Sequence, residues 1–193
     1  MPRITLHTSQ VLTHLAGAIP LARLAWGLTH GAYFNPVEAM TLQTGNAALI
    51  ALCVTLALSP LRRVTGWYAL IKARRPAGLY AFFYGTLHLL IYALFDRRLE
   101  FSGVAEDILK RKFITAGMLA WLLMLPLALT STQRAIRKLG RTWQKLHYLV
   151  YPTALAGLIH YWWKIKAVGP QAIVYAAVIL GLLLLRPLLR LKK

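Results

Sequence analysis

Residues 146–163 read LHYLVYPTALAGLIHYWW, a largely apolar run that holds two histidines. An earlier run, residues 77–95 (AGLYAFFYGTLHLLIYALF), has the same character and holds one histidine, His88. Runs of this length are close to the roughly 20 residues that an α-helix needs to cross the hydrocarbon core of a bilayer. The two stretches therefore predict membrane-spanning helices that carry ionisable side chains.

Four further apolar runs accompany these two, at residues 11–28, 45–58, 113–129 and 172–185. The chain of 193 residues is 58% hydrophobic, and its mean hydropathy of +0.54 is too high for an ordinary soluble domain. Tilt and flanking polar residues extend the shorter runs. We expect an all-α membrane protein, a six-transmembrane-helix bundle formed by one domain over residues 1–193, with no internal repeat.

The net charge of +18 is distributed as short basic clusters between the apolar runs. In a soluble protein such a charge would suggest nucleic acid, but this distribution indicates topology instead, so we expect a lipid bilayer and no nucleic-acid partner. By the positive-inside rule the loops 59–76 and 130–145, the basic tail with Lys192 and Lys193, and both termini are cytoplasmic. The acidic residues then fall on the opposite side: Glu38, Asp96, Glu100, Glu106 and Asp107.

Two histidines in the apolar runs are predicted to lie at one depth in the membrane. His88 follows Arg75 by 13 residues and His160 follows Lys145 by 15, which at the helical rise places them about 20 and about 22 Å from the cytoplasmic boundary. The third and fifth predicted helices run in the same direction, so both imidazoles could ligate one heme iron. For a single histidine an interhelical hydrogen bond is the favoured role. Matched depth on parallel helices favours heme for this pair.

His147 lies only two residues after Lys145, near the cytoplasmic boundary, and cannot share that iron. If His147 binds a second heme, its partner is open, with His14 as the other histidine at a plausible depth. Pro152 lies between His147 and His160 and could kink the helix. Because Cys53 is the sole cysteine, there is no CxxCH motif and any heme is non-covalent.

Arginine and the remaining histidine have other expected roles. Arg74 and Arg75 are candidate anchors for heme propionates, since guanidinium groups pair with carboxylates but do not usually ligate iron. For His30, as for His14 alone, an interhelical hydrogen bond is favoured over ligation.

Several short motifs spread over nearly the whole chain resemble the MsrQ (YedZ) family and, more distantly, the membrane domain of ferric reductases and NADPH oxidases. They are HLAG at 14–17, RRPAGL at 74–79, TLH at 86–88, LTSTQ at 129–133, KLG at 138–140, WQKLH at 143–147, IHY at 159–161 and PQ at 170–171.

The resemblance implies a heme b electron-transfer subunit of the bacterial inner membrane, with one or two hemes ligated by His88, His160 and His147. It implies electrons taken from quinol or a separate cytoplasmic reductase and given to a periplasmic molybdopterin methionine sulfoxide reductase, MsrP, for repair of oxidised proteins. The chain would then be a relay subunit and not the catalytic one. The family is also associated with FMN, although the sequence has no flavin motif.

One departure from the wider superfamily concerns the second heme. There, four histidines on two helices hold two hemes, whereas here the third predicted helix supplies only His88, and Arg74 stands 14 residues before it. Eight residues follow position 185 and the outer loop 96–112 is short, so we expect both the electron donor and the acceptor domain to be other molecules. The alternative function is a non-redox membrane transporter or assembly factor.

Overall fold

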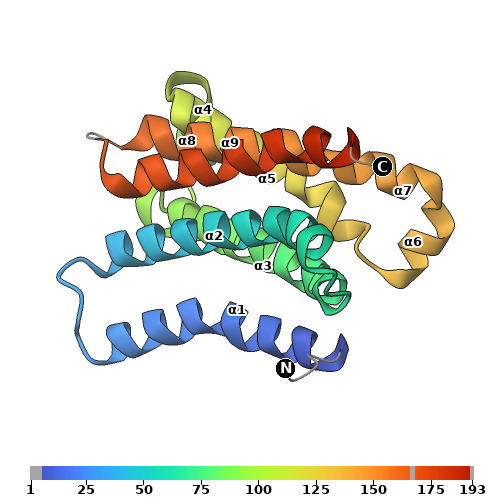
Figure 1. Ribbon diagram of the computed structural model, residues 1–193. Helices are drawn as coiled ribbons and strands as arrows, with labels where there is room; N and C mark the ends of the chain where they lie inside the picture. Colours follow the sequence, from blue (N-terminus) through green and yellow to red (C-terminus); the bar gives the residue numbers. More distant parts are fainter. Residues whose placement is uncertain (1–5, 166–167, 192–193) are drawn as a thin grey trace. The chain divides into compact units, whose positions relative to one another are not determined.

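The computed structural model describes residues 6–165 and 168–191, and each regular element in these ranges is a helix (Figure 1). Lys192 and Lys193 of the predicted cytoplasmic tail lie outside the described residues. The chain divides into two compact units, Met1–Phe101 and Ser102–Lys193. Each unit is a set of packed helices and is considered by itself.

The first unit contains α1 (Leu6–Thr29), α2 (Pro36–Thr65), α3 (Ala69–Ile91) and the short π-helix η1 (Tyr92–Asp96). α2 and α3 pack along each other, and α1 packs against both (Figure 1). α2 begins where Asn35 caps it, because the Asn35 side chain accepts the N–H of Glu38 at 3.2 Å. It ends at Gly66, whose φ of 71° suits a residue without Cβ.

The described part of the second unit contains six α-helices and one 3₁₀ turn. In chain order they are α4 (Phe101–Lys110), α5 (Lys112–Leu129), α6 (Gln133–Leu139), α7 (Arg141–Leu146), the 3₁₀ turn η2 (His147–Leu149), α8 (Val150–Lys164) and α9 (Pro170–Leu191). α8 packs against α5 on one side and against α9 on another (Figure 1). The prediction of a plain loop at 96–112 misses α4. Its apolar residues recur at helical spacing, as in an amphipathic helix: Phe101, Val104, Ala105 and Ile108.

Four helical segments of the described chain are long and apolar enough to cross a membrane: Thr8–Thr29, Pro36–Thr65, Ala69–Asp96 and Lys112–Leu129. They contain the predicted spans 11–28, 45–58, 77–95 and 113–129. The predicted spans 146–163 and 172–185 also form helix, but α8 has 15 residues and the apolar part of α9, Pro170–Leu185, is short as well. An all-helical membrane protein with four candidate spans is thus confirmed, whereas six spans stay a prediction.

The predicted distortion near Pro152 takes the form of the 3₁₀ turn η2, which directly precedes α8. Proline has no N–H to donate to the carbonyl four residues earlier, here that of Tyr148. A tighter turn at this point is the usual response of a helix to such a loss. The turn separates His147 from the regular helix that carries His160.

Candidate functional site

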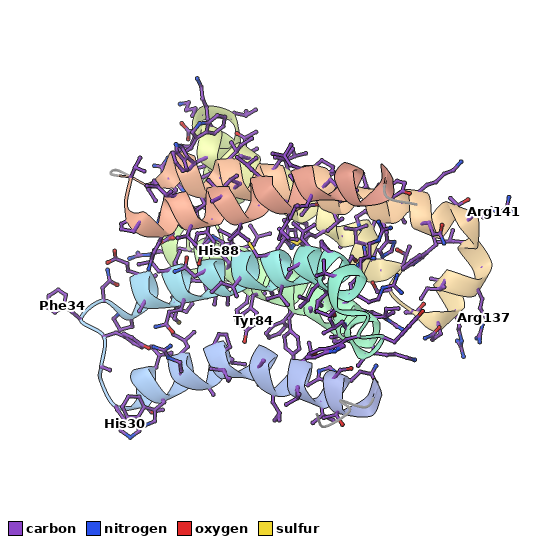
Figure 2. All side chains as sticks on the ribbon, viewed as in Figure 1. His30, Phe34, Tyr84, His88, Arg137 and Arg141 are labelled. Atoms are coloured by element: carbon purple, nitrogen blue, oxygen red, sulfur yellow. The ribbon has the colours of Figure 1, made fainter. Side chains whose placement is uncertain are left out.

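His88 is held against α2 through a backbone carbonyl. Its Nδ1 lies 2.9 Å from the carbonyl oxygen of Thr41, and the ring is half-buried. One helical turn after Thr41 is Gly45, where a Cβ would lie 3.1 Å from both Nδ1 and Cε1 of the ring. The imidazole, labelled in Figure 2, therefore rests on the backbone of α2 at a place where that helix has no side chain.

His160 has the same arrangement in the second unit. Its Nδ1 lies 2.6 Å from the carbonyl oxygen of Phe113 on α5, and the ring is again half-buried. One turn after Phe113 is Gly117, where a Cβ would lie 2.6 Å from Nδ1 and 2.9 Å from Cε1. The ring of His160 is thus packed even more closely on its glycine than that of His88.

The two arrangements are related by one shift along the chain. Each histidine follows its carbonyl residue by 47 positions and its glycine by 43 (45 to 88 and 117 to 160). The two imidazoles are therefore held in the same way by a carbonyl and a glycine of the neighbouring helix. The shared spacing escapes sequence inspection because its contacts use a carbonyl, which Thr41 and Phe113 supply equally well despite their different side chains.

This geometry selects one tautomer of each neutral imidazole. A carbonyl oxygen can only accept a hydrogen bond, so Nδ1 carries the proton and, in the neutral ring, Nε2 carries the lone pair. A histidine that donates one ring N–H to a carbonyl is the arrangement that metal-ligating histidines adopt. Among the described residues no three His, Cys, Asp or Glu side chains cluster to hold a bare metal ion. Single histidines of this kind suit iron that arrives with its own equatorial ligands, as in a porphyrin.

His147 is bound by its own helix segment. Its ring stacks on Trp143 with centroids 3.8 Å apart and an interplanar angle of 28°, and its Nδ1 lies 3.1 Å from the Trp143 carbonyl oxygen. Trp143 in turn donates its indole N–H to the carbonyl of Thr130 at 2.9 Å. Under the shift that carries His88 to His160, the counterpart of His147 is Arg75. The first unit thus has an arginine where the second has its additional histidine.

The two predicted propionate anchors differ in their surroundings. Arg74 is half-buried and lines a cavity of about 270 Å³ at the α2–α3 turn, whereas Arg75 is exposed and does not line it. The cavity is lined by basic and apolar residues: Leu58, Ser59, Arg62, Arg63, Leu70, Ile71 and Arg74. Three guanidinium groups around one cavity suit a carboxylate or phosphate.

His14 on α1 and His30 directly after α1 are exposed, with polar contacts nearby. His14 Nδ1 lies 3.2 Å from the hydroxyl of Tyr80 on α3. His30 Nδ1 lies 2.9 Å from the carbonyl of Trp26, and its ring stacks on that indole at 4.6 Å. His30 lies at the end of α1 next to the connection that holds Phe34 (Figure 2). Neither ring is among the nearest atoms to a glycine of a neighbouring helix, as those of His88 and His160 are.

The fold and these side chains define a class of protein: a multi-pass helical membrane protein with half-buried histidines in its apolar helices. Comparison with known proteins agrees. The family of the ferric reductase like transmembrane component matches residues 44–158, more than half of the chain. No solved structure matches the chain.

Curated relatives carry one common name, protein-methionine-sulfoxide reductase heme-binding subunit MsrQ. The protein of Ralstonia nicotianae is 47% identical over 190 residues, covering 96% of this chain and 88% of that protein. The protein of Bordetella pertussis is 48% identical over 153 residues, covering 79% and 74%. The protein of Xanthomonas axonopodis pv. citri is 41% identical over 182 residues, covering 91% and 84%. This chain belongs to the MsrQ family, within the ferric reductase-like transmembrane proteins.

Proposed function

We propose that this chain is a heme b electron-transfer subunit in which His88 and His160 would hold the iron of one heme. The observation that supports this most is the duplicated hydrogen bond from a half-buried histidine to a backbone carbonyl, at 2.9 Å for His88 and 2.6 Å for His160. The names of the relatives state heme binding. One domain over residues 1–193 stays a prediction.

The residues present fit a b-type heme. Heme, when bound, supplies a carrier that accepts and releases one electron at a time. The chain contributes two imidazoles whose tautomer is fixed by the Thr41 and Phe113 carbonyls, and Nε2 of each is the nitrogen that would ligate iron. Arg74, with the other guanidinium groups of its cavity, would pair with a propionate or another anion. Arg75 and His14 remain weaker candidates for anion pairing and for a second ligand beside His147.

The proposed path leads from quinol, or from a separate cytoplasmic reductase, to a periplasmic molybdopterin reductase, MsrP, that repairs oxidised methionine. The relatives' name, which includes protein-methionine-sulfoxide reductase, supports the substrate class. In the bacterial inner membrane, a chain with six spans and cytoplasmic termini would have its basic α2–α3 and α5–α8 connections on the cytoplasmic side. The proposal of FMN as a further cofactor is supported by family resemblance alone, and no residues are proposed to bind it.

Replacement of each proposed ligand tests the heme assignment. His88→Ala and His160→Ala should each remove most of the Soret absorbance per purified chain, because iron with one axial ligand is held weakly. His30→Ala is the matched control, since it removes an exposed imidazole from the end of α1. Normal spectra in either ligand variant would show that the pairing is incorrect.

A non-redox transporter or assembly factor is the alternative, and pigment separates it from the proposal. The purified wild-type chain, expressed with ample heme, should show a b-type spectrum and should be reduced by a quinol analogue. A colourless preparation from such cells would favour the alternative. Pyridine-hemochrome analysis of the same sample gives the number of hemes per chain.

A further inference from the structure

We infer that Gly45 and Gly117 are positioning residues for the two proposed heme ligands: each provides a seat without a side chain on which the imidazole of His88 or His160 is held against a backbone carbonyl. This inference rests on the proposed ligation by these histidines. It adds that the geometry of each ligand, and through it the redox potential, is set by a glycine on the helix packed against the one that carries the histidine: Gly45 on α2 for His88 and Gly117 on α5 for His160.

The contact at Gly117 leaves no room for a methyl group. A Cβ built there would lie 2.6 Å from Nδ1, 2.9 Å from Cε1 and 3.2 Å from Cγ of His160. Carbon atoms in ordinary contact are about 3.5–4.0 Å apart, so the ring would have to move outward by the order of 1 Å. That movement would lengthen the 2.6 Å bond from Nδ1 to the Phe113 carbonyl.

The contact at Gly45 is close but less severe. A Cβ there would lie 3.1 Å from Nδ1 and Cε1 of His88 and 3.8 Å from Cγ. A displacement of a few tenths of an ångström would relieve it. The structure therefore assigns an order of sensitivity, in which alanine at position 117 disturbs its histidine more than alanine at position 45.

The glycines are not explained by backbone conformation. Both lie inside regular α-helices, where glycine is less favourable than alanine by about 1 kcal/mol. Alanine at either position would thus favour the helix itself. The recurrence of glycine 43 residues before a histidine in both units (45 to 88 and 117 to 160) instead follows from the need for an imidazole to approach the helix.

The hydrogen bond that the seat permits has an electronic consequence. An imidazole that donates Nδ1–H to a carbonyl is a more basic ligand through Nε2. A more basic ligand stabilises the ferric state, so weakening this bond should raise the midpoint potential. Loss of such an outer-shell partner typically weakens metal binding about 10–100-fold.

The test compares Gly117→Ala and Gly45→Ala in the full-length chain purified with heme, with Gly181→Ala and Gly78→Ala as matched controls. A Cβ at Gly181 meets nothing within 4 Å, and one at Gly78 meets Thr55 at an ordinary 3.5 Å. The measurements are heme retention during competition with apomyoglobin, the low-spin EPR g values and the midpoint potential. We expect Gly117→Ala to lose heme at least tenfold faster, with shifted g values and a higher potential, Gly45→Ala to change less, and both controls to match wild type.

The outcomes separate this inference from the proposed function. If His160→Ala retains heme, the ligation itself is wrong. If His160→Ala loses heme but Gly117→Ala matches Gly181→Ala in g values and potential, only the role of the seats is refuted. Should Gly117→Ala fail to accumulate in the membrane, Gly45→Ala and the bulkier Gly45→Val decide, because the inference requires a graded shift of the His88 signal with side-chain size.

Discussion

The hydroxyl of Tyr84 on α3 bridges two backbone groups of a single turn of α1. It donates to the carbonyl of Gly17 at 2.6 Å and accepts the N–H of Leu21 at 3.2 Å. Tyr84 is only 2% exposed and lies one helical turn before His88. One helical turn earlier on α3, the ring of Tyr80 occupies the place that a Cβ of Gly17 would need. α1 is thereby attached to the helix that carries a proposed ligand.

Replacing Tyr84 by phenylalanine should loosen α1 without removing heme. The variant loses a buried hydroxyl with two partners, a change worth about 1–2 kcal/mol, while the apolar ring remains. We expect a lower apparent Tm of the purified protein and normal Soret absorbance. Tyr80→Phe should have a smaller effect, because the Tyr80 hydroxyl makes longer contacts to His14, at 3.2 and 3.3 Å. A Tyr84→Phe protein as stable as wild type would mean that other contacts hold α1.

His147→Ala should leave the heme of His88 and His160 in place. His147 is engaged with Trp143 in its own segment and is separated from α8 by the turn η2. If a second heme exists, the pyridine-hemochrome value should fall by one heme per chain, and reduction by quinol should slow. Equal heme content together with equal reduction kinetics would remove His147 from the electron path.

Arg74 and Arg75 are adjacent, carry the same charge and differ in surroundings, so they form a matched pair. Arg74→Gln should weaken heme retention or alter the midpoint potential, because Arg74 lines the basic cavity with Arg62 and Arg63. Arg75→Gln changes an exposed residue and should behave like wild type. Retention is measured by transfer of heme to apomyoglobin. The reverse order of effects would assign the anion to Arg75 and leave the cavity without a role in heme binding.

The acidic residues of the predicted periplasmic side are not equivalent. On α4, Asp107 pairs with Arg111 at 3.0 Å with its side chain 6% exposed, and Glu106 pairs with Lys110. Asp96 and Glu100 are exposed outside that helix. We expect the double variant Asp96→Asn, Glu100→Gln to slow electron delivery to the reductase severalfold at low salt, with the difference shrinking as salt is added.

Heme content and reduction by quinol should stay unchanged in that double variant. Glu106→Gln serves as the control for loss of an acidic side chain, because its partner Lys110 lies on the same helix. Asp107→Asn should instead lower the stability of α4, since it leaves Arg111 without its buried partner. Delivery that is equal at low and high salt in the double variant would place docking elsewhere, for example on the 164–170 connection.

The sequence by itself determined the helical membrane class, since apolar runs near the length of a bilayer leave the backbone no other way to satisfy its hydrogen bonds. It also singled out His88, His147 and His160, because ionisable groups in apolar helices are costly enough to mark a site. It did not reveal α4, whose short amphipathic pattern lies between charged residues. The number of spans stays a prediction, because α8 has 15 residues and begins directly after the turn η2.

Only the tertiary structure decided how each histidine is held. The partners of the imidazoles are the carbonyls of Thr41 and Phe113, 47 residues away along the chain. Every residue type has a backbone carbonyl, so the sequence does not show which one accepts the hydrogen bond. The sequence does not predict the role of Gly45 and Gly117 either, since glycine occurs in apolar helices for several structural reasons. Their role emerges only when α2 packs on α3 and α5 packs on α8, because close approach of a ring to a helix is a property of two segments and not of either one alone.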